Sequence, residues 1–136
     1  MYFPVFAKSL ITSTNSSSFN LFIASPKAPT PGKINESAFL ISSKSKVPHM
    51  GWNDLKFEKK DDLILKYIKE GDYVYYVHSY YANSNNKELI AYSEYEKKIP
   101  GIVRKDNVYG LQFHPEKSGQ VGADILKAYK ELILKW

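Results

Sequence analysis

The sequence predicts an α/β fold in which a meander of short strands is followed by one long amphipathic helix. Between residues 72 and 113, short runs rich in Tyr, Val and Ile alternate with polar or Gly/Pro turns, the pattern of closely spaced antiparallel strands. Residues 121–136 repeat apolar side chains at helical spacing. The chain of 136 residues is 43% hydrophobic, enough for one domain with a buried core.

Residues 1–46 differ from the rest of the chain in composition. They hold ten serines and a proline-rich stretch at 25–32, which favours turns or a polyproline-like linker. The candidate strands in this segment are short, at Leu21–Ala24 and Phe39–Ile41. Because such a composition buries little apolar surface, we expect an atypical, poorly ordered segment. Residues 47–136 are expected to form the folded part.

The folded part begins with a predicted loop. Pro48 and Gly51 punctuate it, and it contains Trp52 and Asn53. A structural interpretation of this stretch is a turn anchored by a buried Trp52.

A short helix is expected next, opening at Asp61 and Asp62. The acids complement the positive end of the helix dipole, and Leu63 and Ile64 begin its apolar side. Gly71 is placed for a left-handed cap at its end.

The meander follows, and we expect its strands at Asp72–Ala82, Glu88–Tyr95, Ile102–Arg104 and Val108–Phe113. Polar turns at 83–87, 96–98 and 106–107 separate them. Alternation places Val74, Tyr76, His78 and Tyr80 on one face of the first strand. We interpret His78 as a hydrogen-bonded core residue rather than an acid or base.

The last element is the most strongly patterned helix. Its apolar positions follow i, i+4, i+7, i+8 spacing, which indicates core packing, and Ser118 is a candidate N-cap. The stripe consists of Val121, Ile125, Ala128, Tyr129, Leu132 and Trp136.

Composition and charge exclude several functional classes. The net charge of +5 divides into +4 over residues 1–46 and +1 over residues 47–136, so the folded part carries no basic patch that would indicate nucleic-acid binding. The absence of cysteine excludes a disulfide framework and a thiolate metal site. No apolar run is long enough to cross a bilayer, so no membrane-spanning helix is expected. The N-terminus has no basic residue ahead of its apolar stretch, which argues against a secretory signal peptide.

The chemistry-bearing stretch is Gly110–Ser118, in which His114 and Glu116 follow a predicted strand. Pro115 cannot donate to a strand ladder, so the strand should end before it. Strand ends are where α/β folds collect functional groups. An imidazole can accept and return a proton, and a carboxylate on its second nitrogen fixes the tautomer. A lone His-x-Glu is a weak signal by itself.

Two further strings make the signal specific. These are Val47–Asn53 (VPHMGWN) and Tyr75–Tyr81 (YYVHSYY), which precede the string QFHPEKS of residues 112–118. Together they resemble the C-terminal half of a class I, triad-type glutamine amidotransferase, and more narrowly the glutaminase subunit of imidazole glycerol phosphate synthase. The resemblance covers residues 46–134.

The resemblance implies the C-terminal half of a flavodoxin-like fold, with the meander as its smaller second sheet. It also implies glutamine hydrolysis that supplies ammonia to a cyclase subunit in histidine biosynthesis, in the cytoplasm, within a heterodimer and without cofactor or metal. His114 and Glu116 would be catalytic. Trp52, Asn53, Tyr75 and Lys117 would lie at the cyclase interface, where Lys117 pairs with an acid.

The sequence departs from that family in its N-terminal third. The resemblance calls for a Gly-x-Cys-x-Gly elbow and a glycine-rich oxyanion loop, and the chain contains neither. Residues 1–46 are therefore interpreted as non-homologous, frame-shifted or otherwise replaced. We expect no glutaminase activity from the chain alone. Two hypotheses stay open: an incomplete glutaminase subunit, or a non-catalytic module that binds a cyclase-like partner.

Overall fold

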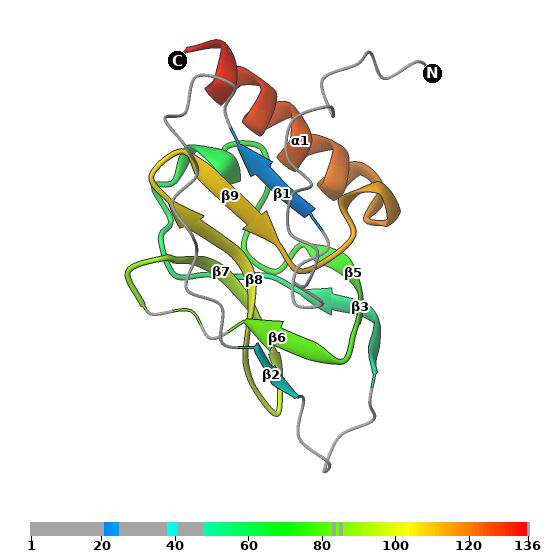
Figure 1. The fold of residues 1–136 in the computed structure, drawn as a ribbon. Helices are drawn as coiled ribbons and strands as arrows, with labels where there is room; N and C mark the ends of the chain where they lie inside the picture. Colours follow the sequence, from blue (N-terminus) through cyan, green and yellow to red (C-terminus); the bar gives the residue numbers. More distant parts are fainter. Residues whose placement is uncertain (1–20, 25–37, 41–47, 83, 85, 136) are drawn as a thin grey trace.

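The computed structural model describes residues 21–24, 38–40, 48–82, 84 and 86–135. Its largest unit is a five-stranded antiparallel sheet in the order β1-β9-β8-β7-β4 (Figure 1). Most of residues 1–46, for which low order is expected, lie outside these ranges, as do residues 83 and 85 of the turn expected at 83–87. The strands of this sheet are β1 Leu21–Ala24, β4 Lys56–Phe57, β7 Leu89–Tyr95, β8 Lys97–Lys105 and β9 Val108–Leu111.

The antiparallel meander predicted for residues 88–113 is confirmed as β7, β8 and β9. Two details differ from expectation. The β7–β8 turn is tighter than predicted, since it centres on Glu96 in the left-handed region (φ 60°) and β8 already begins at Lys97. Pro100 lies inside β8, at a register irregularity opposite Tyr92, where a missing N–H is tolerated.

The remaining strands form two small antiparallel sheets. β3 (His49–Asp54) pairs with β5 (Tyr73–His78), and β2 (Ala38–Leu40) pairs with β6 (Tyr80–Ala82). The strand expected over residues 72–82 is therefore divided at Ser79, and its two parts join different sheets. Alternation along β5 is as predicted, with Val74, Tyr76 and His78 buried.

The prediction of a loop around Trp52 is wrong, because residues 49–54 form strand β3. Gly51 takes a positive φ of 122° within the strand, a conformation that glycine adopts without strain. The turn anchored by a buried Trp is also wrong, since Trp52 is 56% exposed. Pairing with the Tyr- and Val-rich β5 stabilises β3, although Pro48 before it and Gly51 within it disfavour a strand.

The short helix expected after Asp62 is a single 3-10 turn, η1 (Leu63–Leu65). Asp62, expected to complement the helix dipole, is its N-cap, because its Oδ1 accepts from the Ile64 amide at 3.1 Å. Gly71 has a positive φ of 94°. A second 3-10 turn, η2 (Pro115–Lys117), follows His114.

Helix α1 (Gly119–Leu134) confirms the strongest sequence prediction, with Ile125, Ala128, Tyr129 and Leu132 buried. Trp136 lies outside the described residues. Ser118 occupies the N-cap position but makes no side-chain capping bond. Its hydroxyl instead donates to the His114 carbonyl at 2.6 Å.

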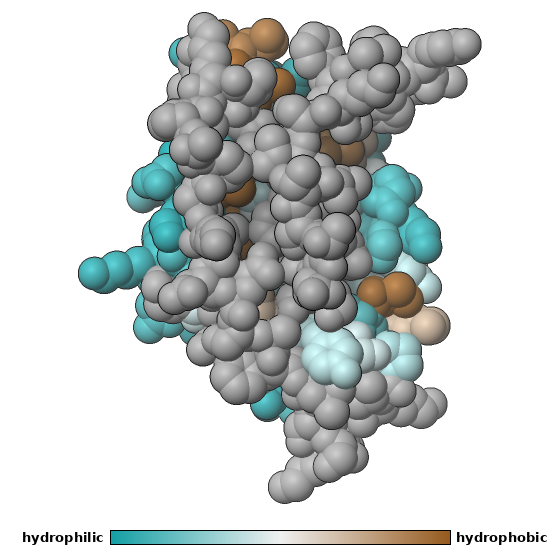
Figure 2. Space-filling view, in the orientation of Figure 1, coloured by the Kyte–Doolittle hydropathy of each residue, from teal (hydrophilic) through white to brown (hydrophobic). Residues whose placement is uncertain are grey.

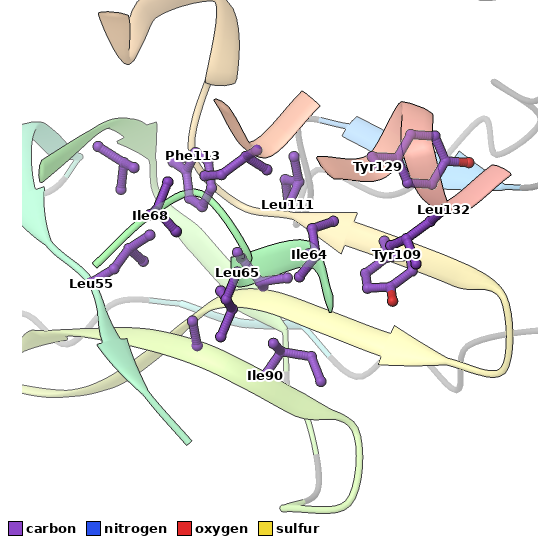
Figure 3. Close-up of a cluster of buried hydrophobic side chains, with 14 of the residues drawn as sticks. Leu55, Ile64, Leu65, Ile68, Ile90, Tyr109, Leu111, Phe113, Tyr129 and Leu132 are labelled. Carbon is purple, nitrogen blue, oxygen red and sulfur yellow. The ribbon is translucent and has the colours of Figure 1, made fainter. Parts of the chain in front are cut away.

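The hydrophobic core fills the space between the sheet and the elements that cover it. Figure 3 shows Tyr109 and Leu111 of β9 together with Ile64 and Leu65 of η1 and Tyr129 of α1. The cluster also takes side chains from β5, β7 and β8. It therefore joins segments far apart in the sequence, and burial of this kind contributes about 25 cal/mol per Å² of apolar surface.

Residues 112–118 cross from the large sheet to β5. The Gln112 amide still donates to Gly101 at 3.0 Å, within the large sheet, whereas the His114 amide donates to the Tyr75 carbonyl at 2.9 Å. The strand expected to reach Phe113 therefore ends at Leu111. This crossing carries the histidine away from the meander and sets it beside β5.

Gly122 of α1 permits the helix to pack closely on this crossing. A Cβ at Gly122 would lie 1.9 Å from the Pro115 carbonyl oxygen. We predict that Gly122→Ala lowers the free energy of unfolding by about 1–3 kcal/mol, despite the better helix propensity of alanine, because the turn must shift. Chemical denaturation measures this cost. Lys130→Ala, at an exposed site of the same helix, should change stability by less than about 0.5 kcal/mol; equal effects of the two changes would contradict the packing.

Candidate functional site: an acid–base pair beside an aromatic face

His114 and Glu116 form a hydrogen-bonded pair. His114 Nδ1 lies 2.7 Å from Glu116 Oε1, so the neutral imidazole donates its Nδ1 proton to the carboxylate. His114 is mostly buried, with 20% of its side chain exposed, while Glu116 is 62% exposed. This is the arrangement that orients a general base and stabilises its protonated form.

The other ring nitrogen of His114 is available for chemistry. Nε2 is buried and has no hydrogen-bond partner among the described residues. With the proton held on Nδ1, Nε2 presents a lone pair that can accept a proton from a nucleophile. The backbone on either side is fixed, because the His114 amide bonds to β5 and its carbonyl accepts from Ser118.

Beside the pair, β3 and β5 present an aromatic face to the outside. We define this aromatic face as Met50, Trp52, Tyr73 and Tyr75, with Lys117 at its border. Trp52 and Tyr75 are cross-strand partners, and their rings meet edge to face with centroids 5.7 Å apart, a favourable geometry. Lys117 Nζ lies 6.0 Å from the centre of the Tyr75 ring.

The aromatic face exposes large hydrophobic side chains. Met50, Trp52 and Tyr73 are 62%, 56% and 57% exposed. In Figure 2, hydrophobic side chains reach the surface on the side where β3 and β5 lie in Figure 1. A group of large exposed apolar side chains rimmed by polar residues is typical of an interaction site.

Asn53, the fourth residue expected at the interface, points to the opposite side of β3. Its amide nitrogen donates to the Glu94 carbonyl at 3.0 Å and lies 3.4 Å from His49 Nε2. Its side-chain oxygen accepts from the Asp54 amide. The structure thus brings Trp52, Tyr75 and Lys117 together and places Asn53 beneath them.

Under the aromatic face lies a buried pair of histidines, His49 and His78, whose contact was not predicted. His49 Nδ1 lies 2.8 Å from His78 Nε2, and His78 Nδ1 lies 2.9 Å from the Tyr80 carbonyl oxygen. Since a carbonyl only accepts, His78 carries its proton on Nδ1, and His49 donates to its Nε2. The two histidines are 3% and 6% exposed. The interpretation of His78 as a core residue agrees with this bonding.

Burial keeps both histidines neutral. It lowers the pKa of His49 to about 4, and the neighbouring His78 acts in the same direction. Burial also lowers the pKa of His78, an effect that the bond to Tyr80 opposes and the charge of a protonated His114 reinforces. The His49 ring stacks between Tyr76 and Tyr95, with centroids 4.6 and 4.0 Å away. No local pattern in the sequence indicates this pair, because His49 and His78 meet only through the register of β3 with β5.

Comparison with known proteins decides the family. The model of the family Glutamine amidotransferase class-I matches residues 24–129. The chain belongs to the class I glutamine amidotransferases.

Curated relatives narrow the resemblance. The chain is 55% identical over 86 residues to imidazole glycerol phosphate synthase subunit HisH of Listeria innocua, which covers 63% of this chain and 40% of the relative. It is 56% identical over 90 residues to the HisH subunit of Caldanaerobacter subterraneus (65% of this chain, 44% of the relative). For the HisH subunit of Bacillus cereus the identity is 49% over 92 residues, with 67% and 43% covered.

The chain therefore spans about 40% of the length of these relatives. The expected α/β class agrees with mixed strands and a C-terminal helix in part of an amidotransferase domain. In the described part of the chain, no helix is long and apolar enough to span a membrane. The same residues hold no cluster of three or more His, Cys, Asp or Glu side chains able to bind a metal.

The histidine pair makes stability depend on pH. An unfolded histidine binds a proton near pH 6.5, whereas folded His49 resists it down to about 4. Below pH 6.5 the unfolded state therefore binds more protons, and stability falls as the pH drops through this window. We predict a loss on the order of 3 kcal/mol from His49 between pH 6.5 and 4.

Denaturant unfolding across this pH range tests the prediction. His49→Gln retains a donor toward His78 but does not titrate, so it should flatten the slope between pH 6.5 and 4. An unchanged slope in this variant would contradict the assignment of the effect to His49.

Proposed function

We propose that this chain supplies the acid–base half of a glutaminase site. In this mechanism His114 Nε2 takes the proton of a thiol as the thiolate attacks the side-chain amide of glutamine, and a thioester forms as ammonia leaves. His114 returns the proton to the departing nitrogen. Glu116 holds the tautomer and stabilises the imidazolium. The observation that carries the proposal is the 2.7 Å His114–Glu116 bond, with Nε2 buried and without a partner in the described residues.

The thiol must come from outside these 136 residues, because the chain contains no cysteine. A serine is a weaker nucleophile, and none stands in a Gly-x-Ser-x-Gly elbow. We propose accordingly that residues 47–136 are the C-terminal part of an amidotransferase domain and that residues 1–46 are an atypical or replaced segment. The chain alone lacks the oxyanion loop as well as the nucleophile.

We propose further that the aromatic face binds a cyclase subunit. The relatives are named as subunits of imidazole glycerol phosphate synthase, and exposed Trp and Tyr side chains are the residues that most often dominate binding energy. Lys117 at the border offers a cation for an acidic group. Asn53 lies on the opposite side of β3 from the aromatic face, and its bond to the Glu94 carbonyl holds β3 against β7.

The second candidate function is binding without catalysis. The exposure of Met50, Trp52 and Tyr73 favours it, because this face needs no nucleophile. Capture of a cyclase subunit with no glutamine hydrolysis in any reconstitution would favour the binding module over the incomplete glutaminase.

The catalytic proposal predicts the outcome of a complementation assay. The chain alone should release no ammonia from glutamine above the blank. Mixed with a polypeptide that carries the N-terminal part of the Listeria innocua subunit, it should release ammonia, because a cysteine then faces His114 Nε2. His114→Asn should lower that rate by about 10²-fold or more. Ammonia from the chain alone, or a reconstituted rate that His114→Asn leaves unchanged, would contradict the proposal.

The docking proposal predicts the effect of truncating the aromatic face. Trp52→Ala should weaken capture of a cyclase subunit at least about tenfold, because a central aromatic anchor is lost. Affinity can be measured by biolayer interferometry. Leu134→Ala is the matched control, since Leu134 is also a large exposed hydrophobic residue, 76% exposed, at the end of α1. Equal losses for the two variants would count against the aromatic face.

A further inference from the structure

Ser118 holds more of the site together than its position at the start of α1 suggests. It is 1% exposed, and its hydroxyl makes two bonds across different elements. Oγ donates to the His114 carbonyl at 2.6 Å and accepts from the Tyr75 amide at 3.0 Å. A hydroxyl supplies one donor and can accept as well, so both bonds form at once.

These bonds complete a closed ring of contacts. The His114 amide donates to the Tyr75 carbonyl at 2.9 Å, and Ser118 returns from the His114 carbonyl to the Tyr75 amide. Both backbone groups of His114 and both backbone groups of Tyr75 are thereby used. The edge of β5 is bonded at this point by the loop that bears the acid–base pair.

The same loop is held from its other side by α1. The Ser118 amide donates to the Pro115 carbonyl at 3.1 Å, and the Gly122 amide donates to the Ser118 carbonyl at 3.2 Å. The backbone on both sides of Glu116 is therefore restrained. Glu116 itself is exposed, and an exposed carboxylate keeps a fixed bond to His114 only if the backbone holds it in place.

From this ring of contacts we infer that Ser118 is a positioning residue of the acid–base pair. Through its two bonds it fixes His114 against β5, so that Nδ1 meets Glu116 and Nε2 stays oriented for a nucleophile. It also ties the pair directly to Tyr75, whose side chain belongs to the aromatic face. This inference rests on the proposed function of His114 and Glu116, and it assigns no contact with substrate to Ser118.

The test reads the tautomer of His114 by ¹⁵N and ¹H NMR of the histidine rings. The chain has only three histidines, so each ring can be assigned by substitution. In the wild type, His114 should carry its proton on Nδ1 and show a downfield Nδ1–H resonance. In Ser118→Ala this resonance should disappear and the two tautomers should mix, while the ring signals of His49 and His78 persist.

Ser93 supplies a matched control. It is fully buried (0% exposed), and its hydroxyl also makes two bonds, to the Asp54 carbonyl at 2.6 Å and the Tyr76 hydroxyl at 2.8 Å. Ser93→Ala should therefore destabilise the chain in a comparable way and leave the His114 resonance in place. If Ser118→Ala keeps the wild-type His114 signals, or if Ser93→Ala removes them equally, the inference is wrong.

Two further measurements protect the test from a variant that does not fold. Ser118→Cys keeps a side chain of similar size with weak hydrogen bonding, and it should show a partial loss of the His114 resonance. In the wild type, the Tyr75 amide should exchange with solvent at least about tenfold more slowly than in an unstructured peptide. An unprotected Tyr75 amide would overturn the inference without any substitution.

Glu116→Ala, which removes the acceptor, separates this inference from the proposed function. If the Nδ1–H resonance of His114 is absent from the wild type, or survives Glu116→Ala unchanged, the acid–base pair itself is wrong. If the resonance depends on Glu116 but not on Ser118, the pair stands and only the positioning role of Ser118 fails.

Discussion

The bond from the His114 amide to the Tyr75 carbonyl is the contact on which the site depends. It is made where the chain leaves the five-stranded sheet and crosses to β5. A buried backbone amide must find a partner, and this one finds it in a strand that is 39 positions earlier in the sequence. The crossing sets the acid–base pair beside the aromatic face, and α1 then packs over it at Gly122. The acid–base pair, His114 and Glu116, and the border of the proposed docking surface, Lys117, thus lie in one short segment.

The periodicity of the sequence was sufficient to predict an element where one side of that element is buried. The α1 stripe and the alternation of Val74, Tyr76 and His78 were predicted because burial of one face imposes the period of the side chains. The turn at Asp106 was predicted because Asp tolerates the left-handed region that it adopts, at φ 55°. These features are local, so nearby residues carry the information.

The features that were missed depend on contacts distant in sequence. β3 was predicted as a loop because Pro48 and Gly51 disfavour a strand, yet pairing with β5 overrides that preference. The His49–His78 bond exists only once β3 and β5 are in register. The roles of Ser118 and Gly122 depend on the crossing of residues 112–118 from the large sheet to β5, and no local sequence pattern predicts that crossing. The bond between His114 and Glu116 could be predicted because the two residues are close in sequence and lie in a specific string.

The chain combines a well-formed acid–base pair with no nucleophile. The chain belongs to the class I glutamine amidotransferases, because its residues 24–129 match the family model, and it spans about 40% of the length of its curated relatives. The pair is held by bonds to β5 and by the residues that lead into α1, all within the described part of this chain, which explains how it can form although the chain lacks a cysteine. Under the proposed function, such a site exchanges protons but needs a thiol from outside the chain to form a covalent intermediate.

The most direct measurement is the scalar coupling across the hydrogen bond between the ¹⁵N of His114 and the carbonyl ¹³C of Tyr75 in the labelled chain. We expect a coupling comparable to those across the β7–β8 ladder, because the bond is 2.9 Å long. If the ladder couplings are seen and the His114–Tyr75 coupling is absent, the crossing is not formed as described. The placement of the acid–base pair beside the aromatic face would then be wrong.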